Sequence, residues 1–290
     1  MRTRWHPLEF LSSPFDPSLA YVSSSVPILR RPIVLASVRL LLAFYALVTL
    51  LVSLVWAGVV SHDINGYFSY FTHLTYIGLC SYYFASGVQT LVYARTNTYL
   101  LRTWPFSKTL QFLHVWLHST VVTFPFVVTI TFWVLLSSLS TFSSTFNAWN
   151  NISVHALNSL YALFEIIFTN TPPPPLVFLL ANIVLLGAYL GVAYITNATQ
   201  GFYTYNFLDP QKQGSFLAAY IAGIAVGYIV VFGIISGIMV MRPRIANKVK
   251  YNKVEGEKEM SVRQAESYSI SGSTACQEHD VETPKDGNRW

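Results

Sequence analysis

Residues 40–60 read LLLAFYALVTLLVSLVWAGVV, an apolar run without a charged side chain. A helix that crosses the hydrocarbon core of a bilayer needs about 20 mostly apolar residues. Further runs of this kind follow at about residues 71–93, 110–136, 151–169, 176–196 and 214–241. Together they predict an all-α fold, a polytopic membrane protein built as a six-transmembrane-helix bundle.

The composition agrees with this class. Of the 290 residues, 53% are hydrophobic and 11% are charged, whereas a soluble domain carries roughly 25% charged residues. The net charge of +5 comes from basic residues that flank the apolar runs, so it does not indicate nucleic-acid binding. The two cysteines, Cys80 and Cys276, form no disulfide framework. We find no phosphate loop, dinucleotide fingerprint or nucleophile elbow, and we expect no cofactor.

The polar segments divide the chain into three predicted parts. Residues 1–32 form a leader with five prolines, which discourage a long helix. Residues 33–241 form the transmembrane domain. Residues 242–290 are polar, rich in Ser and Glu and without periodicity, so we expect a disordered tail.

Basic residues predict the orientation in the membrane. Lysines and arginines gather in the leader, in the linker 94–109 and just after residue 241, whereas the remaining loops hold only Lys212. By the positive-inside rule both termini are cytosolic, in the endoplasmic reticulum or plasma membrane. Two glycosylation sequons, at Asn151 and Asn197, fall on the opposite, exoplasmic face.

The fourth apolar run carries a polar stripe. His155, Asn158 and Glu165 are spaced at i, i+3 and i+10, which places them on one side of a helix. Ionisable groups at membrane depth are costly and commonly functional. Two interpretations of the stripe stay open: a polar network that holds the helices together, and the lining of a site.

Glu165 is the only acidic residue that we place at membrane depth. Arg39 is expected to extend from the entrance of the first span towards the interface. Without a cation at its depth, the Glu165 carboxyl is expected to be protonated, because desolvation disfavours its charged form. Its expected hydrogen-bond partners are Ser86, Tyr83 and Thr123. It should then support the packing of its helix, and Glu165→Gln should be tolerated.

A hydroxyl and an imidazole are predicted at the same membrane depth. Thr72 begins the second span and His155 begins the fourth, so both lie near the exoplasmic face. Such a pair can act as nucleophile and base, with the imidazole accepting the proton as the hydroxyl attacks. Threonines in spanning helices often bond to their own backbone instead. His114 and His118, one turn apart, are the alternative pair for a metal, although interfacial histidines are the simpler interpretation.

Several of these blocks resemble the androgen-induced-protein family of six-span membrane proteins, also described as FAR-17a-like. The likeness lies in the Phe-Thr pair ending at Thr72, the Phe-Trp pair at Phe132, and the spacing from His155 to Glu165. A weaker block, Gly201-Phe-Tyr-Thr-Tyr-Asn-Phe-Leu-Asp209, resembles the segment after the family's fifth span. The family has a further histidine where this chain has Ile152.

Known members of that family are threonine hydrolases that cleave fatty acid esters of hydroxy fatty acids. The resemblance therefore implies Thr72 as nucleophile and His155 as base, with a lipid ester as substrate and membrane lipids as surroundings. Asn158 would orient His155 or stabilise the oxyanion.

The chain also resembles the related rolling-stone family, whose His-x-x-Asn motif matches His155 to Asn158. Its members are not established enzymes. The alternative function is therefore a non-enzymatic multi-pass membrane adaptor or fusion-type protein.

Overall fold

The computed structural model describes residues 20–244, and every regular element in that part of the chain is helical. This agrees with the predicted all-α membrane bundle. Met1–Val240 form one compact unit, and the description below concerns its described residues. The predicted tail at 242–290 lies almost wholly outside the described part, as do the first 19 residues of the leader.

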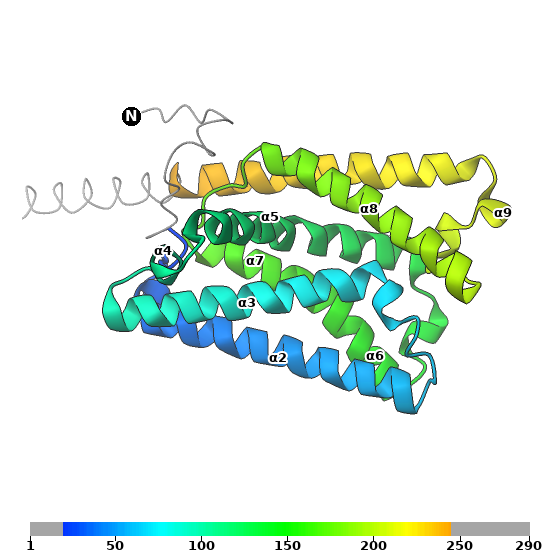
Figure 1. The fold of residues 1–290 in the computed structure, drawn as a ribbon, viewed down its shortest axis with the longest axis horizontal. Coiled ribbons are helices and arrows are strands. Elements are labelled where there is room, and N and C mark those ends of the chain that lie inside the picture. Colours follow the sequence, from blue (N-terminus) through cyan, green and yellow to red (C-terminus); the bar gives the residue numbers. More distant parts are fainter. Residues whose placement is uncertain (1–19, 245–290) are drawn as a thin grey trace, which may run out of the picture. The chain divides into compact units, whose positions relative to one another are not determined.

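Long helices run back and forth along the unit (Figure 1). They are α2 (Pro32–Val59), α3 (Phe71–Thr96), α5 (Ser107–Thr131), α7 (Asn158–Phe168), α8 (Val177–Gln200) and a last helix over Phe216–Arg244. Two π-helical segments extend this set: η3 (Phe132–Leu136) continues α5, and η5 (Ile152–Leu157) joins α6 (Thr145–Asn151) to α7. The short elements are η1 (Ile28–Arg30), η2 (Tyr67–Ser69), α4 (Leu100–Thr103), η4 (Leu139–Phe142), η6 (Asn206–Leu208) and α9 (Pro210–Gln213).

Five helices in the described part are long and apolar enough to cross a membrane. They are Pro32–Val59, Ser107–Leu136, Thr145–Phe168, Val177–Gln200 and Phe216–Arg244. The chain is therefore a multi-pass membrane protein by length and composition. The predicted second span, α3, has the length but is not among these five, so the count of six stays a prediction.

The polar side chains of α3 explain why it differs from the other five. Tyr76, Tyr82, Tyr83, Gln89 and Thr90 are all buried. α3 runs antiparallel to α2 along most of its length (Figure 1), and the cluster between them also receives Val154 and Tyr161. These polar residues lower the hydropathy of α3, but their side chains are buried in the protein.

Local sequence sets where the helices begin and end. Pro32 is the first residue of α2, where its fixed φ suits a helix and its missing N–H costs nothing. Asn97 ends α3 and Gly201 ends α8, each in the left-handed conformation that closes a helix. Ser144 begins α6 by accepting a hydrogen bond from the Asn147 amide at 3.1 Å. The helix predicted as the fourth span, called the fourth spanning helix below, therefore begins at Thr145, several residues before the predicted start at 151.

The described end of the leader packs on the bundle. Tyr21 and Val22 are 2% and 1% exposed. The backbone N–H of Asn170 donates to the Ser23 carbonyl at 3.0 Å, and Ser24 Oγ donates to the Phe168 carbonyl. Residues 20–26 therefore form a strap over the end of α7, and the part of the leader that is described is not separate from the transmembrane domain.

Candidate functional site

Thr72 lines an apolar cavity of about 210 Å³. It is the second residue of α3 and is 7% exposed. The other walls come from α5 and η3, from α8 and from the last helix, and the linker after α8 closes one side. Almost all of these walls are aliphatic or aromatic, such as Phe71, Val128, Ile183 and Leu186. The cavity therefore suits a hydrocarbon chain, with the Thr72 side chain as one of its few polar groups.

Two tyrosines from distant segments line the same cavity as Thr72. Tyr189 of α8 bonds the Ser69 carbonyl at 3.1 Å and Thr204 Oγ1 at 2.9 Å. Burial raises the pKa of the Tyr205 phenol, and hydrogen bonding to the side chain and backbone of Thr72 lowers it in part. The Tyr205 phenol is therefore neutral at physiological pH, and it lies beside Thr72 at the cavity wall.

His155 lies behind one wall of the cavity. Its ring stacks on Phe132 with centroids 3.6 Å apart and planes at 5°, and Phe132 lines the cavity with Thr72. Among the described residues no hydrogen bond joins Thr72 to His155, and His155 Nδ1 has no hydrogen-bond partner. Phe132 thus links the predicted pair: it stacks on His155 and lines the cavity that Thr72 lines.

The backbone at Phe132 and at His155 departs from the α-helix. Phe132 begins η3, and His155 lies in η5. Such π-helical turns are rare and occur frequently at functional sites. Thr129 Oγ1 donates to the His155 carbonyl and contacts Ser159 Oγ at 2.6 Å. These hydrogen bonds join α5 to the fourth spanning helix beside the His155 ring.

Asn158 lies one turn after His155 and is fully buried. Neither its amide nitrogen nor its amide oxygen has a hydrogen-bond partner among the described residues. The predicted hydrogen bond that would orient His155 is therefore absent from this structure. His73, which the sequence did not single out, is near enough to His155 to interact with it electrostatically.

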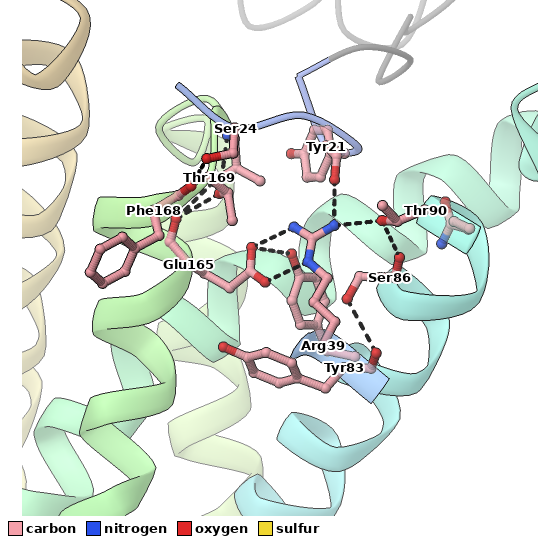
Figure 2. Close-up of polar contacts among 12 residues, drawn as sticks. Tyr21, Ser24, Arg39, Tyr83, Ser86, Thr90, Glu165, Phe168 and Thr169 are labelled. Carbon is pink, nitrogen blue, oxygen red and sulfur yellow. Dashed lines mark hydrogen bonds and ion pairs between the residues drawn. The ribbon is translucent and has the colours of Figure 1, made fainter. Parts of the chain in front are cut away.

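Glu165 belongs to a second polar cluster, at the other end of the fourth spanning helix. Its carboxylate accepts two hydrogen bonds from Arg39, from Nε at 2.8 Å and from Nη2 at 2.7 Å. Both side chains are 0% exposed. Arg39 Nη1 also donates to the Tyr21 carbonyl at 2.6 Å and to Thr90 Oγ1 at 2.8 Å (Figure 2). Tyr82 donates to Glu165 at 3.3 Å.

This ion pair corrects the prediction for Glu165. The carboxyl was expected to be neutral because no cation was expected at its depth, but Arg39 points into the bundle. The reason lies in the helix bounds. α2 begins at Pro32, so Arg39 lies about two turns inside it, and Glu165 lies only three residues before the end of α7. Glu165 therefore has a cationic, bidentate hydrogen-bond partner at its own depth.

The expected partners of Glu165 bond elsewhere. Tyr83 donates to the Tyr161 carbonyl at 2.6 Å, Thr123 donates to the Ser119 carbonyl at 2.7 Å, and Ser86 Oγ bonds the Tyr83 carbonyl at 3.4 Å. The polar stripe of the fourth span is therefore two separate clusters. Glu165 holds helices together, and His155 lies near the cavity.

The histidine pair on α5 lies next to the ion pair. Both rings meet Tyr21 edge-on, with centroids 5.7 Å away for His114 and 5.3 Å for His118. His114 also stacks on Tyr82 at 5.3 Å. Among the described residues, no three His, Cys, Asp or Glu side chains lie together as a metal site would need.

The comparisons with known proteins do not assign this chain to a family. No family model, no curated protein and no solved structure matches it. What the cavity does therefore rests on its own residues.

Proposed function

We propose that this protein is an integral membrane hydrolase of lipid esters, with Thr72 as nucleophile and His155 as base. The observation that carries the proposal is the apolar cavity at Thr72. A reactive hydroxyl at the wall of a hydrocarbon-lined space fits an ester whose acyl chain occupies that space. The resemblance to esterases of hydroxy fatty acid esters supports the same substrate class.

The reaction would follow the scheme of nucleophilic catalysis. Thr72 Oγ attacks the ester carbonyl as His155 accepts the hydroxyl proton, and the carbonyl oxygen becomes an oxyanion. Collapse of this intermediate expels the alkoxide, which takes the proton from His155 and leaves as the alcohol. Water then attacks the acyl-threonine with His155 again as base, which releases the fatty acid and restores Thr72.

Phe132 stacks on His155, and no hydrogen bond joins His155 to Thr72 among the described residues. The imidazole therefore has to approach Thr72 when the ester binds. Catalytic hydrogen bonds are often long in unliganded enzymes and tighten only with substrate. The Tyr205 hydroxyl can turn its proton towards the oxyanion, because it lies beside Thr72 in the cavity wall and is neutral. The distribution of basic residues supports a reaction near the exoplasmic face, with both termini cytosolic.

Fluorophosphonate labelling of the full chain in its membrane tests this proposal. The wild type should be labelled, and Thr72→Ala should lose both labelling and ester hydrolysis. Thr75→Ala is the matched control. Thr75 lies one turn along the same helix, and its hydroxyl bonds the Phe71 carbonyl at 2.9 Å, so its loss should leave labelling unchanged.

Two results would overturn the proposal. Labelling that persists in Thr72→Ala would exclude Thr72 as nucleophile. A wild type that takes no label and cleaves no ester would favour the alternative, a non-enzymatic multi-pass adaptor or fusion-type protein. The observation that favours this alternative is that no hydrogen bond joins Thr72 to His155 among the described residues.

A further inference from the structure

A second apolar space lies beside the Thr72 cavity. It has a volume of about 230 Å³ and is lined on one side by α5 and η3 and on the other by the last helix. We call it the lateral groove. Its rim carries large exposed apolar side chains, with Ile130 54%, Val134 73% and Leu135 45% exposed. In a membrane-spanning bundle, side chains exposed in this way face lipid chains.

The lateral groove adjoins the Thr72 cavity. Val127, Thr131 and Ile224 line both spaces. These shared side chains therefore lie between the Thr72 cavity and the outer surface between α5 and the last helix. A flexible hydrocarbon chain that displaces the Ile224 side chain would run from the Thr72 cavity into the groove, with apolar contacts along most of this path.

Two glycines keep the groove open. Gly223 and Gly227 lie one turn apart on the last helix and line the groove. A Cβ atom added to either would meet no neighbouring atom within 4 Å. The space above them is therefore not filled by protein side chains, and a larger residue would enter the groove without a clash.

We propose that the distal part of the substrate's acyl chain occupies the lateral groove, so that long-chain esters enter and leave sideways from the bilayer between α5 and the last helix. This rests on the proposed ester hydrolysis at Thr72. It adds a subsite that selects for chain length: a short acyl group fits within the Thr72 cavity alone, whereas a long one needs the groove as well.

Glycine replacement tests this subsite in the full-length, membrane-embedded protein. We expect Gly223→Leu and Gly227→Leu to slow hydrolysis of a palmitate ester about tenfold or more, since pocket contacts of a few methylenes discriminate on this scale. Hydrolysis of the butyrate ester of the same alcohol should change little, as should fluorophosphonate labelling. Gly233→Leu and Gly237→Leu are matched controls. They lie on the same helix with equally open surroundings, but line neither space.

A binding measurement gives a second readout that does not depend on turnover. Palmitate with a diazirine at its distal end should crosslink to residues 219–231 in the wild type and much less in Gly227→Leu. Gly227→Ala should give an intermediate loss if the leucine variant fails to fold.

The outcomes separate the two proposals. An unchanged ratio of palmitate to butyrate hydrolysis, in enzymes that still label at Thr72, would overturn the lateral groove and leave the hydrolase intact. Crosslinking to residues 219–231 in a protein that neither labels nor turns over would keep the groove as a chain-binding site and overturn the hydrolase. Crosslinks elsewhere would overturn the groove as well.

Discussion

Arg39 contacts both carboxylate oxygens of Glu165, and neither side chain reaches solvent. Each charge is compensated only by the other and by a few hydrogen bonds, including the one from Arg39 to Thr90. Removal of one partner from such a pair leaves an uncompensated buried charge, whereas apolar replacement of both can be nearly neutral. The pair is therefore costly to break and modest in its net contribution.

We predict that Glu165→Gln and Arg39→Met each lower the free energy of unfolding by about 3–5 kcal/mol. The double variant Arg39→Met with Glu165→Leu should lose clearly less than the sum. Unfolding in mixed micelles titrated with a denaturing detergent measures this. This prediction replaces the expectation from sequence that Glu165→Gln would be tolerated.

The exposed ion pair between Lys212 and Asp209 provides the control. Its charged atoms are 3.6 Å apart and the Lys212 side chain is 63% exposed. Lys212→Met should therefore cost less than about 1 kcal/mol. Two results would contradict this account of the buried pair. The double variant could lose as much free energy of unfolding as the two single variants together, or each single variant could lose as little as Lys212→Met.

At the scale of elements, α3 decides how many times the chain crosses the membrane. Its buried tyrosines and its Gln89 lower its hydropathy. It nevertheless lies along α2 for most of its length (Figure 1). If it spans, the segments before and after it lie on opposite sides of the membrane.

We predict that Ser61→Cys and Thr98→Cys, both at exposed positions, react with a membrane-impermeant maleimide from opposite sides of sealed vesicles. The background should lack Cys80 and Cys276. Ser143→Cys should react from the same side as Ser61→Cys, because α5 with η3 crosses once more. Reaction of Ser61→Cys and Thr98→Cys from one side would reduce the count to five.

The sequence predicts the spanning helices well and the contacts between them poorly. An apolar run of sufficient length reports a span directly, so α5 with η3 ends at Leu136, as expected. The N-cap depends on the Ser144 side chain, and the π-helical turns around Phe132 and His155 depend on backbone hydrogen bonds. Hydropathy registers neither. The start of the fourth spanning helix was therefore misplaced.

The sequence proposed residues for the candidate site but not their geometry, and their roles stay a prediction. The predicted topology placed Thr72 and His155 at one membrane depth, but Phe132, which stacks on His155 and lines the cavity with Thr72, comes from a third segment. Tyr205 lies 133 positions after Thr72, and only its place in a short aromatic block marked it. The partner of Glu165 was missed because Arg39 lies 126 positions away, and because helix depth was judged from apolar residues alone.

For the whole unit, the strap at residues 20–26 closes the end where Arg39 and Glu165 meet. Tyr21 is almost fully buried between the strap and α5, and its carbonyl accepts from Arg39. Truncation of a buried aromatic side chain costs about 3–5 kcal/mol. The strap should therefore contribute to the stability of the whole bundle.

We predict that Tyr21→Ala lowers the free energy of unfolding by about 3 kcal/mol, measured in the same detergent titration. Phe44→Ala is the comparison, since Phe44 is 61% exposed and should cost less than about 1 kcal/mol. If Tyr21→Ala and Phe44→Ala lowered the free energy of unfolding equally, the strap would not stabilise the bundle.

The distance in sequence between Arg39 and Glu165 also has a consequence for biogenesis. The ribosome completes α2 and delivers it to the translocon before α7 has been synthesised, so Arg39 enters the membrane without its counter-ion. An arginine at the centre of an inserting helix costs about 2.5–3.5 kcal/mol, and a position nearer the headgroups reduces this cost. We therefore expect α2 to reach its final depth only when the helix that carries Glu165 arrives. A nascent chain that stops before residue 165 presents an unneutralised charge to the machinery of membrane-protein quality control.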